Sequence, residues 1–254
     1  MKVAITRAVS ARIDRCELSY QAREAIDVAR AREQHRRYED CLAACGYTVQ
    51  RLAEEPDLPD AVFVEDTAIV LDELAVITRP GAESRRAETG SVAAALQPFR
   101  RLCHIEPPGT LDGGDVLPFG RTLYIGRSRR TNQAAVAQLC DLLGTYGYEV
   151  KAVQVRRCLH LKSAVTSVAA DVLLINPDWI DEDAFPAVMK IAVDPGEPAA
   201  ANALLLDDGV VFPAAHPATR RRLENYGLRV HAVEVSELAK AEGGVTCCSL
   251  IVPD

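Results

Sequence analysis

Five short segments, each placing polar residues beside an apolar run, recur along the chain at similar spacing. They begin at Phe63, Leu111, His160, Ala201 and Thr246, at intervals of 48, 49, 41 and 45 residues. A period in the forties without strong identity between units is typical of radially repeated β-rich modules, as in a propeller. In such a fold the polar residues of the five segments would converge on one axis. These residues are Glu65, Asp66, Asp112, His160, Asn202 and Cys247. An irregular α/β fold with coincidental spacing is the alternative.

The rest of the chain alternates between strand-like and helical patterns, which indicates an α/β fold. Strand-like runs rich in Val, Ile and Leu cover residues 3–6, 62–70, 75–78, 123–125, 172–175, 204–206 and 249–252. Helical spacing of apolar residues covers 22–44, 83–99 and 132–146. No glycine-rich phosphate loop follows an early strand, which argues against a dinucleotide site. Since no linker rich in Pro, Gly or Ser interrupts the pattern, we expect one domain over 1–254.

Composition narrows the range of partners. The 254 residues carry a formal charge of -7 and are 48% hydrophobic, so we expect a sizeable core and no nucleic-acid or membrane partner. The first residues lack a signal-peptide pattern and no segment is long and apolar enough to span a membrane, so we expect a cytoplasmic protein. The eight cysteines show no paired CxxC spacing, and only five histidines are present, so we expect no metal site.

Cys247 and Cys248 follow two glycines near the C-terminus. We expect them to begin a strand, where successive side chains face opposite sides, so that only one thiol can face a site. From spacing alone, two buried core cysteines are the simpler interpretation.

His160 lies in an alternating run with Cys158 and Lys162, which predicts a strand. A lone histidine in such a run is usually structural, but a cysteine nucleophile needs a nearby acid or base. Asp112 precedes two glycines, and an aspartate can fix the tautomer of an imidazole. A plain Asp-Gly turn is the alternative for that motif.

Three carboxylates, of Asp60, Glu65 and Asp66, lie around an apolar run, and strand parity would place Asp60 and Asp66 on one face. Buried carboxylates need compensation, and a planar guanidinium matches them well. A solvated strand end is the alternative. Arg85 and Arg130 follow strand-like runs, where their forked donors suit a carboxylate ligand.

Six motifs taken together, in order through nearly the whole chain, closely resemble the dimethylarginine dimethylaminohydrolase family of guanidine-modifying enzymes. They are Phe63-Val64-Glu65-Asp66, Thr78-Arg79-Pro80-Gly81-Ala82, Leu111-Asp112-Gly113-Gly114-Asp115-Val116, Arg130-Thr131-Asn132, Leu159-His160-Leu161-Lys162 and Thr246-Cys247-Cys248-Ser249. The resemblance implies a five-bladed α/β propeller, the pentein fold, with ββαβ-like modules.

The same resemblance implies roles for individual residues. Cys247 matches the nucleophile, His160 the acid/base, and Asp112 the carboxylate that orients the histidine, with Asp where some relatives have Glu. The other matches concern the substrate: Asp60, Glu65 and Asp66 surround the guanidinium, Arg85 and Arg130 hold the α-carboxylate, Leu18 belongs to a lid, and Ala241 offers its backbone.

The implied activity is hydrolysis of Nω-methylated arginines to citrulline and an amine through a covalent cysteine thiouronium, without a cofactor. An arginine deiminase or amidinotransferase is the nearest alternative function. A guanidine-binding module without catalytic activity and a thiol redox sensor are less favoured alternatives. The expected partner is the small methylated arginine, and a second copy of the chain, giving a homodimer, is a further candidate.

Overall fold

The computed structural model describes residues 2–185 and 188–253, and in these residues the strands form five three-stranded sheets. In each sheet a middle strand pairs antiparallel with one neighbour and parallel with the other. The sheets are β15–β1–β2 (Leu250–Val252, Val3–Arg7, Thr48–Leu52), β3–β4–β5 (Ala68–Val70, Leu74–Ile77, Arg101–His104), β6–β7–β8 (Val116–Phe119, Thr122–Arg127, Glu149–Gln154), β9–β10–β11 (Val165–Ala169, Val172–Ile175, Met189–Ala192) and β12–β13–β14 (Leu204–Leu206, Gly209–Pro213, Val230–Val233).

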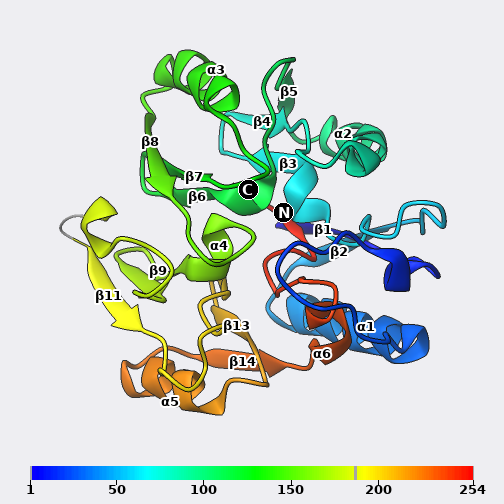
Figure 1. The fold of residues 1–254 in the computed structure, drawn as a ribbon, viewed down its shortest axis with the longest axis vertical. Helices are drawn as coiled ribbons and strands as arrows, with labels where there is room; N and C mark the ends of the chain where they lie inside the picture. The colour runs from blue at the N-terminus through cyan, green and yellow to red at the C-terminus, as the bar shows by residue number, and fades with distance from the viewer. Residues whose placement is uncertain (1, 186–187, 254) are drawn as a thin grey trace.

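Each parallel pair is joined by a crossover, because parallel neighbours cannot be linked by a tight hairpin. The crossovers contain α1 (Val28–Ala44), η3 (Glu83–Glu88) with α2 (Thr89–Leu96), α3 (Gln133–Gly144), η5 (Glu182–Ala184) and α5 (Pro217–Asn225). Figure 1 shows α1, α2, α3 and α5 on the outside of the arrangement. The repeated unit is therefore a hairpin, a crossover and a parallel outer strand, which confirms the α/β class and the five expected modules.

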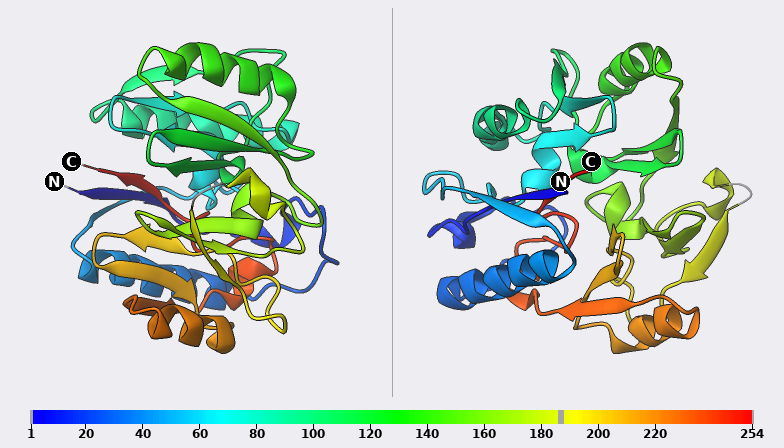
Figure 2. Two further views of the ribbon diagram at one scale, coloured as in Figure 1. Left: turned by 90° about the vertical axis from the view of Figure 1, so that its left-hand side faces the viewer. Right: turned by 180° about the vertical axis from the view of Figure 1, so that it is seen from behind.

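The two ends of the chain share one sheet, since β15 pairs with β1 from Val3 opposite Val252 to Ile5 opposite Leu250. Both ends lie together in Figures 1 and 2. Successive modules also touch: β15 contacts β3, β6 and β12 both contact β9, and α1 contacts β14.

The middle strands carry the apolar core. All residues of β4 and β10 are buried, and both strands consist of apolar residues only. A continuous apolar run is typical of a strand covered on both faces. Burial of each such Leu, Ile or Val side chain contributes roughly 1.5–3 kcal/mol relative to exposure.

Short helices occupy several positions where we expected strands. Residues 64–67 form η2 (Val64–Thr67), so the strand predicted over 62–70 begins only at Ala68. His160 does not lie in a strand either: it precedes α4 (Leu161–Ala164), so the predicted alternation of Cys158, His160 and Lys162 is wrong. The parity argument for Asp60 and Asp66 fails for the same reason.

The first helix is also shorter than predicted. It begins at Val28 and not at residue 22, because the Asp27 side chain caps it by accepting a hydrogen bond from the Arg30 backbone N–H at 3.0 Å. No helix in the described residues has the length and apolarity needed to cross a membrane.

Candidate active site

Two adjoining cavities meet at Cys247. The larger, of about 340 Å³, also reaches His160, Lys162 and Asn202, and we call it the main cavity. The smaller, of about 20 Å³, is lined by Asp60, Asp66, Arg85, Arg130, Ala241 and Glu242 as well as by His160 and Cys247, and we call it the inner cavity. The side chains that line the two cavities come from segments between residues 17 and 247, so it is the folding of the chain that brings them together.

The loop that carries Cys247 lies between α6 (Ser236–Ala239) and β15. Its two cysteines do not begin a strand as expected, because β15 starts only at Leu250. They nevertheless separate: Cys247 faces both cavities, whereas Cys248 is fully buried in an apolar core. The Sγ of Cys247 accepts a hydrogen bond from the Gly244 backbone N–H at 3.2 Å.

Glycine is required at position 244 by close packing. A Cβ there would lie 2.3 Å from Oδ1 of Asn202. That oxygen accepts from the Thr246 backbone N–H at 3.1 Å, and the Asn202 amide donates to the Thr246 hydroxyl at 2.9 Å. Asn202 therefore holds the loop that carries Cys247 from the neighbouring module.

Burial raises the pKa of the Cys247 thiol well above its ordinary value, and the nearby carboxylates of Glu65 and Asp66 raise it further. The sulfur is accordingly a neutral thiol in the free protein at neutral pH. A cation placed beside these carboxylates would favour the thiolate.

His160 is the acid/base candidate on the same cavity wall. Its Nε2 lies 3.0 Å from Oδ2 of Asp112, and its Nδ1 lies 3.8 Å from Oδ1 of Asp66. Burial alone would lower the pKa of His160, but Asp66 and Asp112 outweigh burial and raise the pKa to about 9. The side chain is thus an imidazolium at neutral pH, and it can donate a proton.

The Asp112-Gly113-Gly114-Asp115 turn supports this imidazolium. Asp112 is fully buried and accepts from the Gly81 backbone N–H at 2.8 Å. A Cβ on Gly114 would lie 2.6 Å from Nδ1 of His160 and 2.9 Å from Oδ1 of Asp66. The second glycine of the motif is therefore required by close approach to the histidine.

Asp66 and Arg85 form the centre of a buried ion network. Arg85 contacts Oδ2 of Asp66 at 2.5 Å and Oε2 of Glu88 at 2.8 Å, and it donates to the Phe63 carbonyl at 3.1 Å. Although burial opposes the charge, Glu88 and Asp66 keep the pKa of Arg85 well above its usual value. Burial favours protonation of Asp66, yet His160 and Arg85 lower the pKa of Asp66 to about 2.

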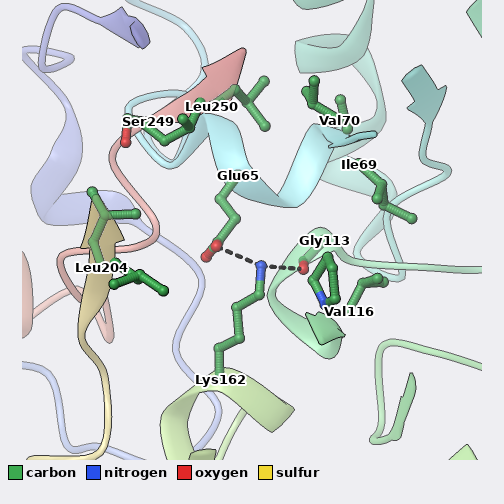
Figure 3. Close-up of a pocket in the computed structure, with 13 residues that line it drawn as sticks. Glu65, Ile69, Val70, Gly113, Val116, Lys162, Leu204, Ser249 and Leu250 are labelled. Atoms are coloured by element: carbon green, nitrogen blue, oxygen red, sulfur yellow. Dashed lines mark hydrogen bonds and ion pairs between the residues drawn. The ribbon is translucent and has the colours of Figure 1, made fainter. Parts of the chain in front are cut away.

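Glu65 forms the wall between the main cavity and a further cavity of about 250 Å³. Lys162 donates to its Oε1 at 2.7 Å and to the Gly113 carbonyl at 3.2 Å, as Figure 3 shows. The Thr246 hydroxyl donates to Oε2 at 2.7 Å. Both carboxylate oxygens of Glu65 therefore have partners within the protein.

Asp60 and Arg130 line the inner cavity where residues 17–21 cover it. Asp60 is buried and accepts from the Glu17 backbone N–H at 3.1 and 3.2 Å. Burial raises the pKa of Asp60 above its ordinary value, and the opposing positive charge of Arg85 offsets only part of this effect. Arg130 donates to the Ser19 hydroxyl at 3.2 Å, and this is the one hydrogen bond of its guanidinium within the described residues.

The Glu242 carboxylate holds the covering segment in place. It accepts from the backbone N–H groups of Ser19 at 3.1 Å, Tyr20 at 2.6 Å and Gln21 at 2.7 Å. Leu18 lies within this segment and packs against the core, and Ala241 is buried beside Glu242. Leu18, which the resemblance links to a lid, and Ala241, which it expects to offer its backbone, therefore each lie next in the chain to a residue of the contact between Glu242 and residues 19–21.

A family model described as "N,N dimethylarginine dimethylhydrolase, eukaryotic" matches residues 2–192 of this chain. The chain belongs to the dimethylarginine dimethylaminohydrolase family. Relatives of that name are 39% identical in Streptomyces coelicolor, over 98% of this chain and 96% of the relative, and 36% identical in Pseudomonas aeruginosa, over 88% and 89%.

Solved structures agree with the family assignment. A cysteine-to-serine mutant of the Pseudomonas aeruginosa dimethylarginine dimethylaminohydrolase, complexed with citrulline, has a TM-score of 0.94 at 34% identity and covers 98% of both chains. An adduct of a histidine-to-glycine mutant dimethylarginine dimethylaminohydrolase with S-methyl-L-thiocitrulline has a TM-score of 0.94 at 33% identity, over 99% of this chain and 100% of that one. A cyanobacterial arginine dihydrolase domain at 19% identity shares the fold.

Sequence reasoning missed three polar residues of this dimethylarginine dimethylaminohydrolase family site. Asp115 accepts from the Leu161 backbone N–H at 2.9 Å and from the Thr131 hydroxyl at 2.7 Å, and burial raises its pKa to about 6. It thereby holds the segment that presents His160. Thr246 and Glu242 were missed as well, and a carboxylate beside a glycine pair was the available signal for Glu242.

Asp66, Asp112 and His160 have ligand atoms within 4.8 Å of one another, so they could in principle hold a cation. Their lone pairs already serve other partners: Asp66 accepts from Gly114 and Arg85, and Asp112 accepts from Gly81. The donor set is thus better suited to charged hydrogen bonding than to metal ligation.

Proposed function

We propose that this protein hydrolyses Nω-methylated arginines, both the asymmetric dimethyl and the monomethyl forms, to citrulline and dimethylamine or methylamine. The proposal rests on one observation: the Cys247 thiol and the His160 imidazolium, which Asp112 holds, line the same two cavities. Family membership and the citrulline and thiocitrulline complexes of relatives support this activity.

The substrate would lie with its amino-acid end in the inner cavity. Arg130 has guanidinium donors left for the α-carboxylate, whereas Arg85 is engaged by Asp66 and Glu88. We therefore assign the main carboxylate contact to Arg130 and a supporting one to Arg85. Because Asp60 lies beside residues 17–21 and Ala241, we assign it to the α-amino group, in place of the guanidinium contact expected from the sequence. Leu18 would belong to the cover.

The guanidinium end would lie between Asp66, Glu65 and Cys247. Its positive charge offsets the carboxylates that hold the Cys247 pKa high, so the thiol releases its proton to solvent as the substrate binds. The thiolate then attacks the guanidinium carbon and gives a neutral tetrahedral adduct. Asp66 fixes the nitrogens of this adduct, as an oxyanion hole fixes oxygen in acyl transfer.

His160 then transfers its proton to the methylated nitrogen, the carbon–nitrogen bond breaks, and dimethylamine leaves. The product on the enzyme is a cationic thiouronium at Cys247, and His160 is now neutral. It takes a proton from water as the oxygen attacks the same carbon. As the bond between Cys247 and the carbon breaks, the sulfur takes up the hydroxyl proton of the neutral adduct, so citrulline leaves and the Cys247 thiol is restored. His160 keeps its proton for the next turnover.

We propose further that residues 1–254 form one domain and that the five modules close into a five-bladed propeller. The pairing of β15 with β1 and the contacts between successive modules support closure. Assembly into a homodimer and a cytoplasmic location stay predictions, which light scattering of the purified protein and cell fractionation would test.

The function is tested by measuring citrulline release from asymmetric dimethylarginine, monomethylarginine and arginine under the same conditions. We expect clear turnover of both methylated substrates, with stoichiometric amine release, and at least tenfold lower kcat/KM for arginine. Preference for arginine with ammonia release would instead identify a deiminase.

A further inference from the structure

Two cysteines and one histidine come together where α1 of the first module contacts β14 of the last, outside the two cavities at Cys247. Cys41 and Cys45 lie at the C-terminal end of α1, and His231 lies on β14. The two Sγ atoms and a ring nitrogen of His231 all lie within 4.8 Å of one another. We propose that these three side chains form a binding site for a soft divalent cation of the Zn²⁺ class.

The spacing of the ligands suits such an ion. Cys41 and Cys45 are four residues apart on a helix, so their side chains lie on one face, one turn apart. Zinc binds thiolate sulfur at about 2.3 Å and imidazole nitrogen at about 2.0–2.1 Å in a tetrahedron, which places ligand atoms roughly 3.4–3.8 Å apart. Ligand atoms already within 4.8 Å need only small side-chain rotations to reach that geometry.

His231 also has an orienting partner of the kind that metal-bound histidines use. Its Nε2 lies 3.3 Å from the Asp208 backbone carbonyl and 3.7 Å from the Asp208 carboxylate. Donation from Nε2 to that carbonyl would leave Nδ1 unprotonated, as metal ligation requires. The fourth position is open to water or to the Asp208 carboxylate, which Arg229 now contacts at 2.5 Å.

The three side chains are half-buried, so an ion can enter from solvent while the apolar core closes the inner side. Each thiol gives up its proton as the metal–sulfur bond forms, so binding one ion releases two protons. No oxidant or reductant takes part. None of the three residues lines the cavities at Cys247, so the site is separate from the proposed hydrolysis.

Occupation would fasten α1 to β14, segments about 190 residues apart in the chain. The same helix supports the nucleophile loop, because the Tyr38 hydroxyl donates to the Val245 carbonyl at 2.9 Å and lies 2.6 Å from the Ser249 hydroxyl. A bound ion therefore stabilises the fold by mass action and steadies the helix behind Cys247.

The site is tested with the full chain carrying Cys247→Ser, so that the active-site thiol is removed, in a reductant that does not bind metal. One equivalent of Co²⁺ serves as a coloured substitute for zinc. We expect the visible bands of tetrahedral cobalt together with a sulfur-to-cobalt charge-transfer band. Adding Cys41→Ser and Cys45→Ser should abolish these bands, and His231→Ala should weaken them. The matched control, Cys140→Ser at an exposed cysteine of α3, should leave them unchanged.

A second measurement protects against loss of folding in the variants. In the protein whose one substitution is Cys247→Ser, Zn²⁺ should raise the Tm relative to the same protein in chelator. This shift should vanish when Cys41→Ser and Cys45→Ser are added. Cobalt bands that survive the double substitution, or no bands when thiol titration shows both cysteines reduced, would overturn the proposal. A Cys41–Cys45 disulfide in air with no metal bands under reductant would make the pair a redox feature and reject the metal site.

Discussion

The Nε2 atom of His160 lies 3.0 Å from Oδ2 of Asp112, although 48 residues separate the two in the chain. Each comes from the loop before the first strand of its module: Asp112 precedes β6 and His160 precedes β9. The repeated architecture therefore brings the histidine and the carboxylate that bonds it together from equivalent positions of neighbouring modules, and we propose that they act as the acid/base and its orienting group.

Replacing Asp112 by Asn should impair the acid function of His160. Asp66 still raises the pKa of His160 in the variant, but the hydrogen-bonded charge is lost, so the pKa falls from about 9. Because the imidazolium is the active form, kcat/KM of the unaltered protein should fall as pH rises through about 9. In Asp112→Asn this fall should occur at lower pH, and the maximum should drop by about 10²–10⁴-fold. An unshifted alkaline limit would contradict the assignment of the proton donor.

The same ionisation predicts a change in stability. The pKa of His160 is higher in the folded protein than the ordinary 6.5, so its contribution to stability is fully present below about pH 6.5 and is lost as pH rises through about 9. Urea unfolding of the unaltered protein across this window should show a decline that is shallower in Asp112→Asn.

Replacing Arg130 by Lys should weaken substrate binding. Lysine keeps the charge but loses the forked donors, and a charged hydrogen bond contributes about 1.5–3 kcal/mol, so KM should rise about 10- to 100-fold with a smaller effect on kcat. Arg85→Lys is the comparison variant. It disrupts the buried ion network with Asp66 and Glu88, so it should lower the Tm, which Arg130→Lys should not. A KM unchanged in Arg130→Lys would remove Arg130 from the carboxylate contact.

Replacing Gly114 by Ala should displace His160, since the new Cβ would lie 2.6 Å from its Nδ1. A shift of about 1 Å in a catalytic group can cost about 10²-fold in rate, so kcat should fall by that order. Gly90→Ala is the matched control, because a Cβ on Gly90 in α2 meets nothing within 4 Å. Alanine there should leave kcat unchanged and stabilise the helix by about 0.5–1 kcal/mol. Equal activity in the two variants would rule out the packing argument.

Replacing Glu242 by Gln should loosen the cover over the inner cavity. The carboxylate accepts from three backbone N–H groups of residues 19–21, and hydrogen bonds to a charged acceptor are stronger than neutral ones. Amide hydrogens of residues 17–21 should then exchange faster and KM should rise. Glu234→Gln, at an exposed position, should change neither. Protection of 17–21 that persists in Glu242→Gln would show that other contacts hold the segment.

Much of this arrangement could be predicted from the sequence, because the spacing of polar segments follows the repeated module. The local conformation of those segments could not. His160 and Cys247 were expected in strands, but a carboxylate or amide from elsewhere fixes each of their turns: Asp115 bonds the backbone after His160, and Asn202 bonds the backbone before Cys247. Such long-range hydrogen bonds leave no periodic signal.

The role of Glu242 was hidden for a similar reason. Its partners lie more than 220 residues earlier in the chain, and they are backbone groups that any sequence supplies. In contrast, the division between Cys247 and Cys248 was anticipated, although the strand alternation used to argue it is absent.

The central claim is that Cys247 carries the covalent intermediate, and the most direct measurement is mass spectrometry of the protein quenched in acid during turnover of asymmetric dimethylarginine. We predict an adduct with the mass of the thiouronium, located on Cys247 by fragmentation of its peptide, in the unaltered protein and in Cys248→Ser. Cys247→Ser should show neither adduct nor citrulline. An adduct on Cys248, or citrulline release by Cys247→Ser, would contradict the account.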